Sequence, residues 1–174
     1  MKGDVSTVSS FDAVPQVFFF GEQNRATGTF GIRIVQQNGE IYSDMAHSAQ
    51  ITSFEYSVIN NAGILFSGSR DRRVKAWSMQ QGSLKCDVDK LMPAEVLCMQ
   101  LTSPTYLVAG LSDGTLAGWD LLSDQISILP AHISPITSIM LHDQFLVSGD
   151  ASGILKMFDT TNNFRVVLEG KTNF

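Results

Sequence analysis

The stretch SGSRDRRVKAW at residues 67–77 occurs in three versions along the chain, the other two being AGLSDGTLAGW at 109–119 and SGDASGILKMF at 148–158. In each version a glycine stands nine residues before a large aromatic residue. One such match could arise by chance, whereas three indicate that the chain is built from repeats. The pairs are Gly68 and Trp77, Gly110 and Trp119, and Gly149 and Phe158.

The repeats extend upstream of the glycine, where each begins with a short apolar run. These runs start at Val5, Ile51, Val96 and Ile136, which are 46, 45 and 40 residues apart. Each unit contains four short apolar runs with turn residues between them, which indicates four antiparallel strands. Self-similarity at this period is typical of β-propeller blades. We therefore predict an all-β fold in a single domain, with four blades at about residues 1–45, 46–90, 91–130 and 131–174.

The second unit shows the strand pattern most clearly. The first unit is less regular, and either Phe30 or Val35 is its counterpart of Trp77. Phe30 leaves 21 residues before Ile51, whereas the other units use 19 and 17 and Val35 leaves 16, so we choose Val35. The loop at 21–29 is then longer than its counterparts, and long loops on a repeat scaffold often lie on a binding face. In the second unit the strands are predicted at 51–57, 64–67, 74–79 and 84–88.

The units resemble those of the WD-repeat β-propeller family, and the resemblance covers nearly the whole chain. A good blade of that family carries a hydrogen-bonded group of histidine, serine or threonine, aspartate and tryptophan. The second unit has all four, as His47, Ser67, Asp71 and Trp77. The resemblance implies that the histidine bonds the aspartate in a turn and is held over the indole. We expect these side chains to be structural, because a fully satisfied polar group of this kind stabilises the fold.

The third and fourth units keep only part of this group. The third has Met92 in the histidine place and Ala109 in the serine place, and the fourth has Ser152 in place of the turn aspartate. The apolar periodicity is unchanged, so both units are still expected to form blades. The structural residues that remain are Asp113 and Trp119 in the third unit and His132, Ser148 and Phe158 in the fourth.

The number of blades is the least expected feature. Propellers of the resembled family usually close with seven or eight blades, and this chain supplies four. An open stack exposes two apolar faces and its strand edges to water, and large apolar patches usually mark interfaces. We therefore expect further blades from another chain, a second copy or a longer product. A compact four-bladed ring is the alternative.

The composition is that of a globular chain, with 44% hydrophobic residues and only 17% charged residues. The net charge of -5 argues against binding nucleic acid over the whole surface, because phosphate binding depends on lysine and arginine. No apolar stretch reaches 18 residues and no secretory signal is visible at the amino terminus, so we expect no membrane partner and a cytoplasmic or nuclear location.

Residues that could carry catalysis or hold a cofactor form no recognisable pattern. Cys86 and Cys98 show neither the spacing of a zinc site nor a predictable disulfide, and Cys98 is expected in the core. There is no GxSxG elbow and no phosphate-binding loop. The run Val17 to Phe20 is expected to be a buried strand. We predict no enzymatic activity and no cofactor or metal.

One face of the blades is the candidate site for partners. The resemblance implies that the loops before the first strand and between the second and third strands meet on the usual partner-binding face. Guanidinium groups suit bidentate capture of carboxylate or phosphate, so an acidic or phosphorylated peptide is a candidate ligand. The alternative is a solvated turn whose arginines pair with nearby acids. The residues of this face are Gln50, Arg70, Arg72, Arg73, Glu95, Ser112, Pro135 and Asp150.

Recognition is therefore the predicted function. Our first hypothesis is a noncatalytic scaffold for protein-protein interaction that works within a larger assembly. A second is a substrate receptor or adaptor of a ubiquitin ligase, a role that the resembled family often fills. A third is an RNA-processing scaffold that binds nucleic acid through the arginine-bearing face, against which the acidic net charge counts.

Overall fold

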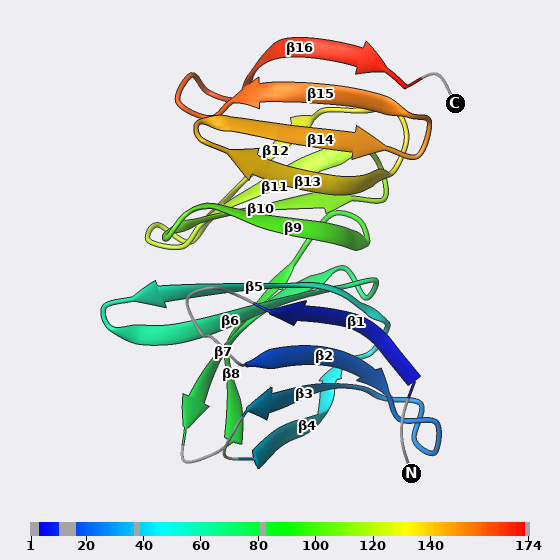
Figure 1. Ribbon diagram of the computed structural model, residues 1–174, viewed down its shortest axis with the longest axis vertical. Coiled ribbons are helices and arrows are strands. Elements are labelled where there is room, and N and C mark those ends of the chain that lie inside the picture. The colour runs from blue at the N-terminus through cyan, green and yellow to red at the C-terminus, as the bar shows by residue number, and fades with distance from the viewer. Residues whose placement is uncertain (1–3, 11–16, 37–38, 81–82, 173–174) are drawn as a thin grey trace. The chain divides into compact units, whose positions relative to one another are not determined.

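The computed structural model describes residues 4–10, 17–36, 39–80 and 83–172. All regular structure in these residues is β, in four sheets of four antiparallel strands each (Figure 1). Within each sheet the strands follow one another in chain order, because short hairpins join neighbouring strands. The predicted all-β fold with four-stranded blades is confirmed. In the described residues no helix is long and apolar enough to cross a membrane.

The chain forms two compact units, which divide it after residue 93. Unit 1 holds the first two blades. The first blade is β1 (Asp4–Ser10), β2 (Phe18–Gln23), β3 (Phe30–Gln36) and β4 (Gly39–His47). The second blade is β5 (Ile51–Ile59), β6 (Ala62–Ser69), β7 (Arg73–Gln80) and β8 (Ser83–Leu91), so its strands run slightly longer than predicted.

Unit 2 holds the third and fourth blades. The third blade is β9 (Val96–Ser103), β10 (Tyr106–Leu111), β11 (Thr115–Asp120) and β12 (Gln125–Pro130). The fourth blade is β13 (Ile136–His142), β14 (Phe145–Asp150), β15 (Ile154–Asp159) and β16 (Arg165–Lys171).

The strand register explains the glycine-to-aromatic spacing. Trp77 lies opposite Leu65, three residues before Gly68, and Trp119 and Phe158 lie opposite the equivalent leucines of their own blades. In the first blade the residue at this register position is Val35, opposite Phe18. The choice of Val35 over Phe30 is therefore confirmed. The loop between β2 and β3 is longer than its counterparts, as predicted.

A β-bulge recurs near the start of the first strand in all four blades. In three of them the extra residue carries a hydroxyl that donates to the carbonyl of the blade's glycine, which pins the bulge. The bonds run from Ser6 to Gly21 at 3.0 Å, from Thr52 to Gly68 at 3.1 Å and from Thr137 to Gly149 at 3.2 Å. The first residue of each run, such as Ile51, stands immediately before this bulge.

The core of each unit lies between its two blades. In unit 1, Phe19 and Ile34 of the first blade are buried with Leu65 and Trp77 of the second. This arrangement corrects the expectation for the run Val17 to Phe20. Successive side chains of a strand point to opposite faces, so Phe19 is buried while Phe18 is exposed on the other face.

The core of unit 2 follows the same plan. Val108 and Leu116 of the third blade are buried together with Leu146 and Phe158 of the fourth. In both units, therefore, the face that carries the aromatic position of one blade covers the opposite face of the preceding blade.

Candidate protein-interaction site

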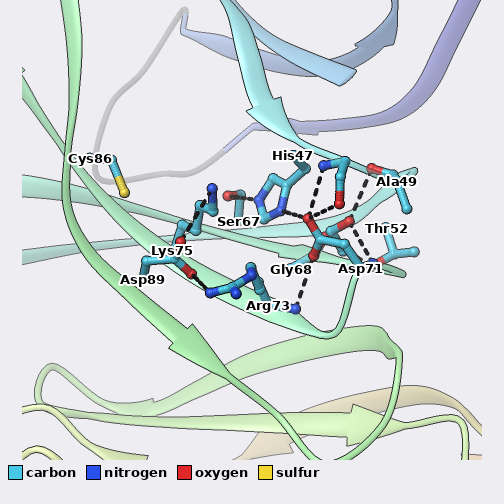
Figure 2. A network of polar contacts seen from close by, with 12 residues as sticks. His47, Ala49, Thr52, Ser67, Gly68, Asp71, Arg73, Lys75, Cys86 and Asp89 are labelled. Atoms are coloured by element: carbon cyan, nitrogen blue, oxygen red, sulfur yellow. Dashed lines mark hydrogen bonds and ion pairs between the residues drawn. The ribbon is translucent and has the colours of Figure 1, made fainter. Parts of the chain in front are cut away.

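The second blade contains a chain of hydrogen bonds around His47, the last residue of β4 (Figure 2). Its Nδ1 lies 2.9 Å from Oδ2 of Asp71, and its Nε2 lies 2.7 Å from Oγ of Ser67. Oγ of Ser67 also accepts a bond of 2.8 Å from Nε1 of Trp77. Because an indole can only donate, the serine proton goes to Nε2, and a neutral His47 carries its own proton on Nδ1, which donates to Asp71.

Asp71 joins this chain to the loop between β6 and β7. Its carboxylate also accepts from the backbone N–H of Ser48 and of Arg73, each at 3.0 Å. Burial acts to raise the pKa of Asp71, but the hydrogen bond and electrostatic attraction of the His47 N–H and the two backbone N–H groups outweigh it and lower the pKa to about 2. Asp71 is therefore ionised at neutral pH, and it joins the loop between β4 and β5 to the start of β7.

The backbone of this loop is held at each side. The N–H of Arg70 donates to the carbonyl of Gln50 at 3.0 Å, and the N–H of Met92 donates to the carbonyl of Arg72 at 2.7 Å. Arg72 has a φ of 66°, in the left-handed region. The side chains of Gln50, Arg70 and Arg72 are exposed. The loop is thus a rigid support that presents two arginines to solvent.

Arg73 belongs to a different group. It begins β7, and its guanidinium lies 2.8 Å from Oδ1 of Asp89 on β8, which also pairs with Lys75 at 3.5 Å (Figure 2). The cluster of three arginines in the sequence is therefore divided in space. Arg73 follows the alternative of pairing with a nearby acid, while Arg70 and Arg72 stand on the loop.

The same backbone bond recurs in unit 2. The N–H of Ser112 donates to the carbonyl of Glu95 at 2.9 Å, and the N–H of Ala151 donates to the carbonyl of Pro135 at 2.9 Å. The second, third and fourth blades thus each bring together the two loops that we assigned to the partner-binding face. Glu95 and Ser112 are half-buried and Pro135 is exposed. That the loops of all blades meet on one face stays a prediction.

Asp150, which we assigned to the partner-binding face, forms hydrogen bonds within its own blade. It is buried at the end of β14, and its Oδ2 lies 3.0 Å from Nδ1 of His132. Its Oδ1 accepts from the hydroxyl of Ser152 at 2.7 Å and from the N–H of Ile154 at 3.0 Å. Burial opposes the ionisation of Asp150, but these donors lower its pKa. Asp150 therefore fills the aspartate role that we expected Ser152 to have replaced, and Ser152 supports it.

The fourth blade holds the residue types of a hydrolase triad. Nε2 of His132 lies 2.6 Å from Oγ of Ser148, as Nε2 of His47 does from Ser67 at 2.7 Å. A catalytic serine must reach a substrate carbonyl, yet Ser148 and Ser67 are both completely buried. The geometry of these groups therefore fits a structural role.

In the third blade the tryptophan indole donates to a different acceptor. Ala109 offers its Trp119 no hydroxyl, and the indole Nε1 instead donates to Oδ1 of Asp124 at 3.0 Å. Asp113 closes its own turn by accepting from the N–H of Thr115 at 3.0 Å. Sequence reasoning missed Asp124, although an aspartate in the turn directly after the tryptophan strand was a usable signal.

The described residues also include a groove and two free thiols. A groove of about 570 Å³ in unit 2 is lined by hydroxyl, amide, aromatic and aliphatic side chains, including Tyr106 and Phe164, whose rings stack at 6.0 Å. Cys98 is largely buried, which raises its pKa to about 12, and Cys86 is exposed with a raised pKa. Among the described residues, no three His, Cys, Asp or Glu side chains are grouped to hold a metal.

Four-stranded antiparallel sheets in chain order, packed face to face within each unit, define the blades of a β-propeller. The family model described as "WD domain, G-beta repeat" matches residues 39–78 and 123–159. The chain therefore contains WD repeats in these two stretches, and such repeats are typical of scaffolds for protein-protein interaction. Each matched stretch begins with the last strand of one sheet and continues into the next sheet.

A search of solved structures finds similar folds. One is the crystal structure of the computationally designed Ika8 protein, with 23% identity and a TM-score of 0.77. The match covers 98% of this chain and 50% of the designed chain, so this chain spans half the length of that protein. A search of curated protein sequences finds no match.

Proposed function

We propose that this protein is a noncatalytic scaffold that captures an anionic peptide segment through Arg70 and Arg72, within a larger assembly. The observation that carries the proposal is the rigid β6–β7 loop, which is fixed through Asp71, Gln50 and Met92 and leaves both arginine side chains exposed.

Rigidity matters because a binding loop that is ordered beforehand loses less conformational entropy when the ligand arrives. Guanidinium groups bind carboxylate and phosphate with paired N–H donors, so both acidic and phosphorylated peptides fit the chemistry of the loop. The net charge of -5 disfavours long anionic polymers but leaves local capture by two arginines feasible.

The test is a binding titration with two fluorescent probes. One is a hexaglutamate peptide, and the other is a glycine-serine peptide whose only charged side chain is one phosphoserine. The double variant Arg70→Glu/Arg72→Glu is expected to lose binding of the preferred probe. The control is Arg165→Glu, because Arg165 is exposed on β16 and lies outside the loop. Adding Glu169→Lys to this control restores the net charge of the wild type. Comparing the two probes distinguishes carboxylate from phosphate capture.

Two results would overturn the proposal. One is equal binding by wild type and the double variant. The other is tighter binding of a single-stranded RNA homopolymer with a steep loss of affinity as salt rises, because that behaviour is the signature of phosphate-backbone binding and favours the RNA alternative.

A further inference from the structure

The recurring glycine of each blade forms a notch for the next blade. A Cβ atom on Gly21 would lie 2.9 Å from Cβ of Ile51, and one on Gly110 would lie 2.7 Å from Cγ2 of Ile136. Real Cβ atoms do not approach so closely, so only glycine admits these side chains. Ile51 and Ile136 are completely buried in these notches. In both units, therefore, the first residue of one blade inserts against the glycine of the blade before it.

Among the described residues, none from another blade fills the notch of the fourth blade. A Cβ on Gly149 would meet Cδ2 of Leu155 and Oγ of Ser138, each at 3.1 Å, and both belong to the same blade. The face around Gly149 is apolar and open, since Leu155 is 43% exposed and Met140 and Leu168 are also exposed. In the third blade the equivalents of this face, Val108 and Leu116, are covered by the next blade.

The complementary residue is present at the other end of the chain. Val5 precedes the bulge of β1 as Ile51 precedes the bulge of β5, and it pairs with Glu22 as Ile51 pairs with Ser69. Val5 is nevertheless 52% exposed. Val8 and Phe18, which share its blade, are exposed as well. The chain thus carries an unfilled notch and an uncovered β-branched residue of the kind that fills such notches.

We propose that two copies of this chain bind head to tail, with Val5 of each copy seated against Gly149 of the other. The inference rests on the larger assembly in the proposed function and names its partner as a second copy. Val5 and Gly149 would repeat the contact made by Ile51 and Gly21. Two such contacts close a dimer by twofold symmetry. The similar designed protein is twice as long as this chain, so a protein of similar fold can hold twice this length of chain.

The contact is tested with charged substitutions at its two sides. Val5→Lys and Leu155→Glu each place an ion in an apolar interface and are expected to convert a dimer to a monomer. Val58 and Met79 are matched controls, because they are 51% and 49% exposed and belong to the second blade, not to the first or the fourth. Val58→Lys and Met79→Glu are expected to leave the dimer intact. Light-scattering mass and circular dichroism are measured for each purified full chain.

Mixing the two interface variants tests the head-to-tail arrangement. A mixed dimer contains one contact with native Val5 and native Leu155, and one in which Lys faces Glu. Equimolar Val5→Lys and Leu155→Glu are therefore expected to regain the mass of two chains, although each variant alone is monomeric. The regained dimer also shows that both variants are folded.

Three results would overturn the proposal. These are a soluble wild-type chain that stays monomeric up to about 100 µM, far above a micromolar Kd, a wild-type dimer that survives both interface variants, and interface variants that stay monomeric when mixed. None of these results depends on Arg70 or Arg72, so the failure of this inference and the failure of anion capture are distinguishable.

Discussion

The second and fourth blades hold a buried histidine in the same geometry but obtain its carboxylate from different places. Asp71 reaches His47 from the loop after β6, whereas Asp150 reaches His132 from the last residue of β14. The serine below the ring also differs in its partners, since Ser67 receives an indole N–H and the fourth blade has Phe158 at the indole position. The histidine therefore requires a carboxylate at its Nδ1 but does not require it from one position in the chain.

The largest expected effect comes from removing the two carboxylates. Asp71→Ala and Asp150→Ala each leave a buried imidazole and at least two backbone N–H groups without an acceptor, and each is expected to lower the free energy of unfolding by about 3 kcal/mol. Urea titration measures the loss. Equal losses mean that the two carboxylates stabilise their histidines equally. A much smaller loss for Asp150→Ala would show that His132 depends less on its carboxylate than His47 does.

Asp143→Ala is the control for this pair. Asp143 also lies near a histidine, His142, at 3.8 Å, but both side chains are largely exposed. Its replacement is expected to change stability by less than about 0.5 kcal/mol. Labelling of the buried Cys98 thiol localises the damage, because faster labelling in Asp150→Ala than in Asp71→Ala shows that unit 2 opens by itself.

A smaller effect is expected in the dependence of stability on pH. The pKa of Asp71 is about 2 in the folded chain and about 3.9 in an unfolded one. A lowered pKa stabilises the fold above the unfolded value, and this stabilisation is lost as pH falls from about 4 to 2. The stability difference between wild type and Asp71→Asn is therefore expected to shrink across this range.

The pKa of Asp150 is lowered as well, so Asp150→Asn is expected to follow the same direction. Unfolding by urea at pH 2, 3, 4 and 6 measures both variants. A difference from wild type that stays constant from pH 6 to pH 2 would contradict the assignment of an ionised carboxylate at either histidine.

The smallest effect is expected at the indole positions. Trp77→Phe gives the second blade the aromatic residue of the fourth and removes a bond to the buried Ser67, at an expected loss of about 1 to 2 kcal/mol. Trp119→Phe removes a bond to the exposed Asp124, and about 0.5 to 1 kcal/mol is expected. Thermal unfolding measures the loss of stability in both variants. A larger loss in Trp119→Phe would show that burial of the acceptor does not determine how much the indole hydrogen bond stabilises the fold.

Much of the fold was predictable because its signals are local. The spacing from Gly68 to Trp77 depends on one hairpin, and the same spacing placed Val35 in the least regular blade. The group of His47, Ser67, Asp71 and Trp77 followed from resemblance, and the structure joins all four by hydrogen bonds. The division of the arginine cluster was not predictable, because the register of β7 with β8 places Asp89 opposite Lys75, where it also pairs with Arg73.

The amino-acid sequence alone determined the repeat, the four-stranded blades and the glycine and aromatic positions, since alternation, turn residues and spacing act within a few tens of residues. Only the tertiary structure decided that Asp150 serves His132, that Asp124 serves Trp119 and that Val5 is exposed while Ile51 is buried. These outcomes depend on where separate segments meet in space. The hydrogen-bond partner and the burial of a side chain depend on which segments pack around it, so they cannot be predicted from the identity of one residue.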